Sequence, residues 1–206
     1  MVTSSDSLLT KTQQKSAAKI LGAAFSQDPF MTYVFPDTTS RMQNLTNLFL
    51  PIIRCSLRCG GVEISPEGGA LAWLSGECLP LRLSQLTRSG LIWTPLLMGL
   101  PAFRRLQGHD SVCEHELKKR APDGFAYLWL VGVHPTAKGR GLGSKMIRST
   151  LGAMQRQGHT ACLLRTDNEK NVPFYKHLGF KQIYTDTVPS SQLRYWLLSQ
   201  NLTQQA

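Results

Sequence analysis

The chain has 206 residues, of which 42% are hydrophobic and 8% are aromatic. This composition predicts one packed globular protein and argues against a disordered chain. Lysine and arginine outnumber aspartate and glutamate by 23 to 13, which gives a formal net charge of +10. The basic residues are spread along the chain and no stacking-aromatic motif accompanies them, so no nucleic-acid partner is expected.

The five cysteines are odd in number and are scattered through predicted helices and strands. This usage is typical of a reducing compartment, so we expect a cytoplasmic protein. Cys55 and Cys59 lie one helical turn apart, but no second cysteine or histidine pair has matching spacing, and no metal site is predicted. The apolar stretches are too short and too interrupted by proline to span a bilayer, so no membrane partner is expected.

The chain begins with a polar segment in which residues 6–9 form at most a short edge strand. Residues 11–27 carry an apolar stripe at helical spacing, and Asp28-Pro29 ends this helix. The loop over residues 28–37 is rich in aromatic side chains. These side chains either pack back on the core or line a cleft.

A second helix is predicted over residues 38–58, kinked at its internal proline. Residues 61–65 and 70–75 flank a turn with two glycines, which predicts a hairpin. Residues 79–120 are punctuated by proline and glycine and predict an insertion of short helices, the last over residues 110–120.

A strand, a glycine-rich loop and a helix follow one another in the second half of the chain. Residues 125–133 are aromatic and aliphatic without polar alternation, which predicts an internal strand. Apolar residues recur at helical spacing over residues 146–154, and Gly158 supplies a C-terminal stop. Glycines in the loop let the main chain approach a ligand, and the first free N–H groups of the helix concentrate positive charge. We therefore expect an anion to bind at this loop, which reads Lys138, Gly139, Arg140, Gly141, Leu142, Gly143 and Ser144.

Two common phosphate-binding motifs do not fit this loop. In a dinucleotide fingerprint counted from Gly139, the sixth position would be glycine, but it is Ser144. A P-loop requires glycine, lysine and then serine or threonine, whereas the order here is Gly143-Ser144-Lys145. Both readings are excluded.

The loop resembles the pyrophosphate loop of the GNAT acetyltransferase superfamily, in which Arg or Gln precedes x-x-Gly-x-Gly/Ala. Lys138 stands at the basic position, followed by Gly141 and Gly143. After a predicted strand over residues 161–166, a second block is similar to the late signature of the same superfamily, Asn171-Val172-Pro173-Phe174-Tyr175-Lys176-His177-Leu178-Gly179-Phe180. Over its whole length the chain resembles the puromycin N-acetyltransferase-like branch, most densely after residue 125.

This resemblance implies an α/β (α+β) GNAT acyl-CoA N-acyltransferase fold. The expected sheet is mixed, mostly antiparallel and twisted, with six to seven strands, the fourth and fifth parallel and splayed. Its last strands would cover residues 182–186 and 193–199. The resemblance also implies a single N-acetyltransferase domain over residues 1–206, with a coenzyme-binding core, acceptor-side helices and a helical insertion at about 125–185, 11–58 and 79–120.

The implied activity is transfer of the acetyl group of acetyl-CoA to a primary amine. The acceptor would be a small molecule, puromycin-like or another amine, which attacks the donor directly in a ternary complex. No metal is implied, and a homodimer is left open. The alternative is a non-catalytic acetyl-CoA-binding protein with a regulatory or interaction role, a reading supported by the absence of a strand carboxylate.

The resemblance also assigns roles to individual residues. Tyr175 falls at the position of the general acid, although it could instead pack with Phe174 beside the sheet. Lys138 replaces a multidentate arginine or glutamine with a flexible point charge, which would weaken the grip on the coenzyme. The positions implied to bind the coenzyme are Val131, Gly132, Val133, Lys138, Gly139, Arg140, Gly141, Leu142, Gly143, Ser144, Asn168, Asn171 and Tyr175.

The general base is not identified from the sequence. Some relatives place a carboxylate on the strand before the loop, where this chain has Tyr127 and Trp129. Glu77 is a weak candidate, and so are His109 and His115, each expected to be an ordinary surface or capping residue. Water relayed through backbone groups could serve equally.

Overall fold

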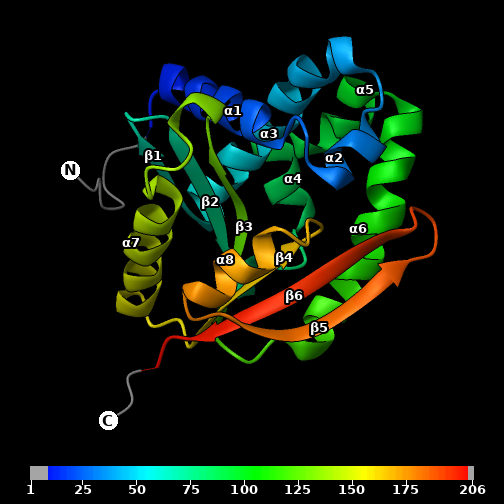
Figure 1. Cartoon of the computed structure of the whole chain (residues 1–206). Helices are drawn as coiled ribbons and strands as arrows, with labels where there is room; N and C mark the ends of the chain where they lie inside the picture. Colours follow the sequence, from blue (N-terminus) through cyan, green and yellow to red (C-terminus); the bar gives the residue numbers. More distant parts are fainter. Residues whose placement is uncertain (1–8, 204–206) are drawn as a thin grey trace.

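The computed structural model describes residues 9–203, in which helices pack on both faces of one six-stranded sheet (Figure 1). The predicted edge strand over residues 6–9 lies outside the described residues except for Leu9, which is not in a strand. The strands are β1 (Gly60–Ser65), β2 (Gly69–Ser75), β3 (Phe125–Val133), β4 (Ala161–Thr166), β5 (Lys181–Val188) and β6 (Leu193–Asn201). The helices are α1 (Lys11–Phe25), α2 (Pro29–Val34), α3 (Thr38–Cys59), α4 (Leu83–Ser89), α5 (Thr94–Met98), α6 (Leu100–Arg120), α7 (Leu142–Arg156) and α8 (Asn171–His177), with 3-10 turns η1 (Gly76–Cys78), η2 (Leu91–Trp93) and η3 (Pro135–Ala137).

The sheet has the strand order β1-β2-β3-β4-β6-β5. Only the pair β3 and β4 is parallel among the described strands, which confirms the expected mixed, mostly antiparallel sheet. The parallel register runs from Phe125 opposite Ala161 to Leu128 opposite Leu164 and then stops. Because β3 continues to Val133, its last residues present an edge that β4 does not cover.

A β-bulge changes which face of the sheet the end of β3 presents. Ala72 pairs with Leu130 and Trp73 pairs with Leu128, so Trp129 is the extra residue between them. An extra residue reverses the alternation of side chains along a strand. As a result Ala126 and Leu128 pack in the core beneath α7, whereas Leu130 packs in the core beneath α1 and α3.

The two faces of the sheet have separate cores. Met146, Ile147 and Met154 of α7 are fully buried against β2, β3 and β4 on one face. On the other face, α1 approaches β3 so closely that a Cβ on Gly132 would stand 2.7 Å from the Cβ of Ala24. Figure 1 shows α1 and α3 together on this second side and α7 on the first. The absence of a side chain on Gly132 therefore allows α1 to pack this closely on β3.

The loop predicted over residues 28–37 contains a helix, α2. Asp28 caps it, because its Oδ1 accepts hydrogen bonds from the backbone N–H groups of Phe30 at 3.1 Å and Met31 at 3.2 Å. Proline at the first helical position suits such a start, so Asp28-Pro29 both ends α1 and begins α2.

The insertion over residues 79–120 ends in a longer helix than expected. Helix α6 begins at Leu100, not near residue 110, and has 21 residues. Ala102, His109, Cys113 and Leu117 are buried at helical spacing, and this continuous stripe outweighs the helix-weakening glycine within it. None of the helices in residues 9–203 is long and apolar enough to cross a membrane.

Candidate active site

A groove of about 410 Å³ lies between the end of β3, the glycine-rich loop and the start of α8. It is the place where the sequence predicts a bound anion. The residues that line it are Val131, Gly132, Val133, Ala137, Lys138, Gly139, Gly141, Leu142, Gly143, Ser144, Asn171, Phe174 and Tyr175.

Two glycines shape the backbone of the loop. Gly139 and Gly141 have φ angles of +81° and +72°, a region that residues with side chains rarely adopt. No atom lies within 4 Å of the place where a Cβ would stand on either glycine, so the space beside them is open. Gly141 caps α7 without a side-chain hydrogen bond, which leaves the first N–H groups of the helix for a ligand. The loop therefore fits an anionic group such as a diphosphate.

Most of the residues implied to bind the coenzyme line this groove, with two exceptions. Arg140 is exposed and is not part of the lining. The side chain of Asn168 accepts a hydrogen bond from the backbone N–H of Lys170 at 3.1 Å and supports the start of α8 instead. The coenzyme contacts remain predictions for both residues.

The uncovered edge of β3 runs along the same groove. Val131, Gly132 and Val133 lie beyond the point where the register with β4 ends. Backbone N–H and C=O groups on such an edge can pair with another extended molecule, as an added strand does. The amide-bearing arm of a coenzyme meets this requirement.

A second cavity, of about 420 Å³, lies on the other side of this edge. Its aromatic lining comes from several elements and comprises Phe25, Phe30, Phe49, Phe103, Trp129 and Tyr175. The insertion contributes the apolar side chains Leu81, Leu86, Leu91, Ile92, Pro95 and Leu106. The polar lining includes Asp28, Asp110, Arg165, Thr166, Asp167 and Asn171. Trp129 alternates with Leu128 and therefore faces this cavity, and the bulge brings Leu130 to the same face.

The two cavities meet at three shared residues, Val131, Asn171 and Tyr175. Asn171 Nδ2 donates a hydrogen bond to Thr166 Oγ1 at 3.2 Å, which ties the start of α8 to the end of β4. Burial, with a smaller contribution from the charge of Asp28, raises the pKa of Tyr175 well above its usual range. The phenol of Tyr175 is protonated at neutral pH and can offer its proton at the junction, as a weaker acid than an exposed phenol.

Asp28 is the carboxylate that the second cavity brings toward Tyr175. Burial, followed by the negative charge of Asp167, raises the pKa of Asp28 to about 6, although hydrogen bonds from Met31 and Phe30 oppose the change. A carboxylate that titrates just below neutral pH is suited to accept a proton. From the sequence, Asp28 is expected only to end a helix, since Asp-Pro carries no signal of its distant partners.

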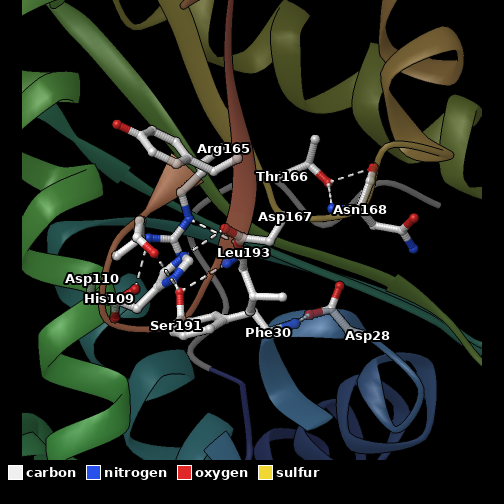
Figure 2. Close-up of polar contacts among 12 residues, drawn as sticks. Asp28, Phe30, His109, Asp110, Arg165, Thr166, Asp167, Asn168, Ser191 and Leu193 are labelled. Atoms are coloured by element: carbon white, nitrogen blue, oxygen red, sulfur yellow. Dashed lines mark hydrogen bonds and ion pairs between the residues drawn. The ribbon is translucent and has the colours of Figure 1, made fainter. Parts of the chain in front are cut away.

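A buried polar network stands beside Asp28 and joins α6 to the end of β4 (Figure 2). His109 Nε2 lies 2.8 Å from Asp167 Oδ1, and His109 Nδ1 lies 2.8 Å from Ser191 Oγ. An ionised carboxylate can only accept, so Nε2 of His109 carries the proton in the pair with Asp167. The imidazole is fully buried and stacks on Phe30, with ring centroids 4.2 Å apart.

Arg165 links this network to a third carboxylate. Its Nε lies 3.2 Å from Asp167 Oδ2, and its Nη1 donates to Asp110 Oδ1 at 2.7 Å. Burial acts to lower the pKa of Arg165, but the charges of Asp167 and Asp110 raise it well above the usual range. Arg165 is the only cation among the described residues that line the cavity. Asp110 and Asp167 pair with it, whereas Asp28, the remaining carboxylate of the lining, has no ion pair with a described residue.

A comparison with known proteins matches the core of this site. Residues 110–180 match the model of the acetyltransferase (GNAT) family, a range that contains the glycine-rich loop and Tyr175. The strand order with its splayed parallel pair is the architecture expected for that family. The chain has the GNAT fold.

Solved structures share this GNAT fold over nearly the whole chain. The C-terminal condensation domain of Ebony, solved with beta-alanyl-dopamine, covers 94% of this chain and 96% of its own, with a TM-score of 0.62 and 10% identity. Arylalkylamine N-acetyltransferase 2 from Aedes aegypti covers 96% of this chain and 98% of its own, with a TM-score of 0.56 and 12% identity. At this identity the likeness shows the fold alone.

A curated relative matches part of the chain in sequence. Mycothiol acetyltransferase from Streptomyces scabiei (strain 87.22) is 32% identical over 92 residues, which are 44% of this chain. The match spans 30% of that protein's length. It therefore concerns a segment of a longer enzyme.

Among the bases considered from the sequence, none lines either cavity of this GNAT fold. Glu77 lies in η1 and is exposed, and His115 is exposed on α6. His109 was expected at the surface, and that expectation is wrong, because α6 turns it inward onto Phe30. The carboxylates of the second cavity are the side-chain candidates that the structure adds, beside water relayed through backbone groups.

His109, Cys113 and Asp167 present possible metal-ligating atoms within 4.8 Å of one another. Burial, above all, raises the pKa of Cys113 to about 12, so its sulfur is a thiol and not the thiolate that a metal prefers. Asp167 already interacts with His109 and the Arg165 guanidinium, whose charge repels a metal cation. This donor set does not fit a metal ion.

Proposed function

We propose that the protein is an acetyl-CoA-dependent N-acetyltransferase that acts on a small-molecule primary amine. The observation that carries this proposal is the meeting of two cavities at Val131, Asn171 and Tyr175. One cavity has the open glycine loop that suits a diphosphate, and the other has carboxylates that suit an amine. Direct transfer requires such an arrangement, because both substrates must be present together.

The residues at the junction divide the work of the reaction. Acetyl-CoA supplies an activated acetyl group when it is bound. Asp28 takes the proton that the attacking ammonium must lose, since its pKa of about 6 leaves it mostly ionised at neutral pH. A backbone N–H at Val131 to Val133 stabilises the negative charge that develops on the carbonyl oxygen.

Tyr175 completes the proton balance. The new carbon–nitrogen bond forms as the carbon–sulfur bond breaks, and the thiolate leaving group takes the phenolic proton of Tyr175. The nitrogen gives its second proton to the phenolate left on Tyr175 as it becomes an amide. The proton held by Asp28 then passes to solvent, which restores the site. Burial raises the pKa of Tyr175, so the phenolate left by the transfer is a strong base and takes up a proton again.

The presence of Asp28 favours the enzyme over the non-catalytic alternative. That alternative is supported by the lack of a carboxylate on the strand before the loop, where Tyr127 and Trp129 stand. Asp28 supplies a carboxylate to the same cavity from the cap of α2. Kinship with the puromycin N-acetyltransferase-like branch remains a proposal from the sequence motifs, and so does a cytoplasmic location, which the five free cysteines support.

The test is release of free thiol from acetyl-CoA by the purified protein in the presence of primary amines. We expect amine-dependent release, and binding of acetyl-CoA measured by calorimetry in the absence of amine. Binding without release for every amine would favour the non-catalytic alternative. No binding of acetyl-CoA would overturn both readings.

A further inference from the structure

The second cavity carries information about the acceptor, given the proposed function. Most of its lining is apolar, and the aromatic side chains Phe25, Phe49, Phe103 and Trp129 come from four different elements. A charged or strongly polar group in addition to the reacting amine would lose its hydration against such a wall, and no partner there would compensate for this loss. The body of a molecule that fits here is therefore apolar.

One carboxylate of the cavity, Asp28, is left without an ion pair among the described residues. Asp28, Asp110 and Asp167 line it, and Arg165 is the only cation among the described lining residues. Arg165 is engaged by Asp110 and Asp167, with which it forms ion pairs. Asp28 has no such ion pair with a described residue, so a single ammonium group that enters the cavity would find this carboxylate as its partner.

The apolar side of the cavity leads away from the reacting junction. Leu81 and Leu91 of the insertion pack with Leu74, which pairs with Tyr127 in the first half of β3. The junction with the donor groove lies near Val131, at the other half of that strand. An amine held at Asp28 would therefore extend its remaining atoms toward the insertion.

Part of the outer surface of the insertion, around Ile92, is also apolar. Ile92 both lines the cavity and is 39% exposed, so the apolar lining reaches the surface there. Trp93 and Leu96 beside it are 59% and 77% exposed. An acceptor longer than the cavity would thus meet apolar side chains where it leaves the cavity beside Ile92.

We propose that the acceptor is a monoamine with an extended apolar body, an aryl or alkyl amine, and that the insertion over residues 79–120 selects it by excluding a second charge. This inference rests on the proposed transferase function and adds the substrate class. It argues against polyamines, amino sugars and peptides as acceptors. The contacts that carry it are the apolar insertion leucines and the single available carboxylate of Asp28.

The test uses acetyl-CoA with a series of primary n-alkylamines from propylamine to octylamine. We expect kcat/KM to rise about fourfold for each added methylene group until the chain reaches the rim. Hexane-1,6-diamine has the length of hexylamine with a second ammonium group, and we expect its kcat/KM to be at least about tenfold lower. A flat series, or a preference for the diamine, would overturn the inference.

Two substitutions on α4 provide a matched pair. Leu86 lines the cavity, whereas Leu83 on the same helix does not and is 67% exposed. Leu86→Glu should lower kcat/KM for hexylamine and raise it for hexane-1,6-diamine, because the new carboxylate can pair with the second ammonium. Leu83→Glu should leave both values unchanged. Equal effects of the two substitutions would contradict a selective role of the insertion.

Binding of octylamine, measured by calorimetry, separates this inference from the transferase itself. Octylamine that binds without thiol release would refute the transferase and leave the apolar amine site in place. Acetylation of propylamine without binding of octylamine would support the transferase and refute the apolar amine site. If Leu86→Glu fails to fold, the kcat/KM values of the wild-type protein for the alkylamines and the diamine still test the inference.

Discussion

Asp28 and Tyr175 line the same cavity, and the negative charge of Asp28 contributes to the raised pKa of the Tyr175 phenol. One residue caps a short helix near the start of the chain, and the other lies on α8 near its end. The cavity thus pairs a group able to take a proton with a group able to give one.

Asp28→Asn should lower kcat by about a hundredfold, in the range that general acid–base catalysis contributes. Asparagine is also a good helix cap, so α2 should keep its start. The wild-type pH profile of kcat/KM should lose activity below a pKa of about 6, as Asp28 becomes protonated. In the variant, kcat/KM should not fall in this way on the acid side of the pH profile. If the acidic fall persists, another group is responsible for it.

The same substitution should stabilise the fold at neutral pH. The pKa of Asp28 is about 6 in the folded protein, against 3.8 for an unperturbed aspartate, so folding disfavours its ionised form. The stability associated with its neutral form is present below pH 3.8 and is lost as the pH rises through about 6. Asp28→Asn should therefore gain about 1–3 kcal/mol of unfolding free energy at pH 7, measured by urea denaturation. A gain that does not shrink toward pH 4 would point to a different cause.

Tyr175→Phe should reduce kcat by about tenfold to a hundredfold while the Kd for acetyl-CoA stays nearly unchanged. The ring remains to pack against Phe174 and Phe180, with centroids 5.2 and 5.9 Å away, so the fold should persist. Circular dichroism checks the fold, and calorimetry checks the affinity. An unimpaired variant would place the acid elsewhere.

Gly141→Arg should abolish binding of acetyl-CoA, because the new side chain fills the space beside the loop. Gly158→Arg is the matched control at the other end of α7, since both glycines have positive φ and no atom within 4 Å of the place where a Cβ would stand. The two variants should lose similar stability through backbone strain. If both retain affinity, or both lose it equally, the phosphate loop has been misplaced.

His109→Phe should lower the unfolding free energy by about 1–3 kcal/mol, because Asp167 and Ser191 each lose a buried hydrogen-bond partner. His115→Phe on the same helix is exposed and should change it by less than about 0.5 kcal/mol. Thermal denaturation followed by circular dichroism compares the two. Similar losses would mean that the buried network adds little to stability.

The donor side of the site could be read largely from local sequence. A strand, a loop with Gly139 and Gly141, and an amphipathic helix are encoded within residues 125–156, and each element follows from φ preferences and apolar spacing. The strand predicted over residues 161–166 has these bounds in the structure. The register that leaves the edge of β3 uncovered was expected from the family resemblance alone.

The acceptor side could not be read in this way. Asp28 acquires its chemistry from burial and from Asp167, and His109 becomes buried because α6 extends back to Leu100. The bulge at Trp129 depends on how β2 pairs with β3, which no local pattern reveals. These contacts join segments that are far apart in the sequence, so they cannot be predicted from the polarity and spacing of neighbouring residues.

By itself, then, the sequence determined most of the segments, their order and the glycine-rich loop, because backbone conformation is governed by neighbouring residues. Only the tertiary structure decided which carboxylate lines the cavity beside Tyr175 and how apolar the rest of that cavity is. The reason is physical: a pKa and a cavity wall are made by desolvation and packing between segments that are distant along the chain.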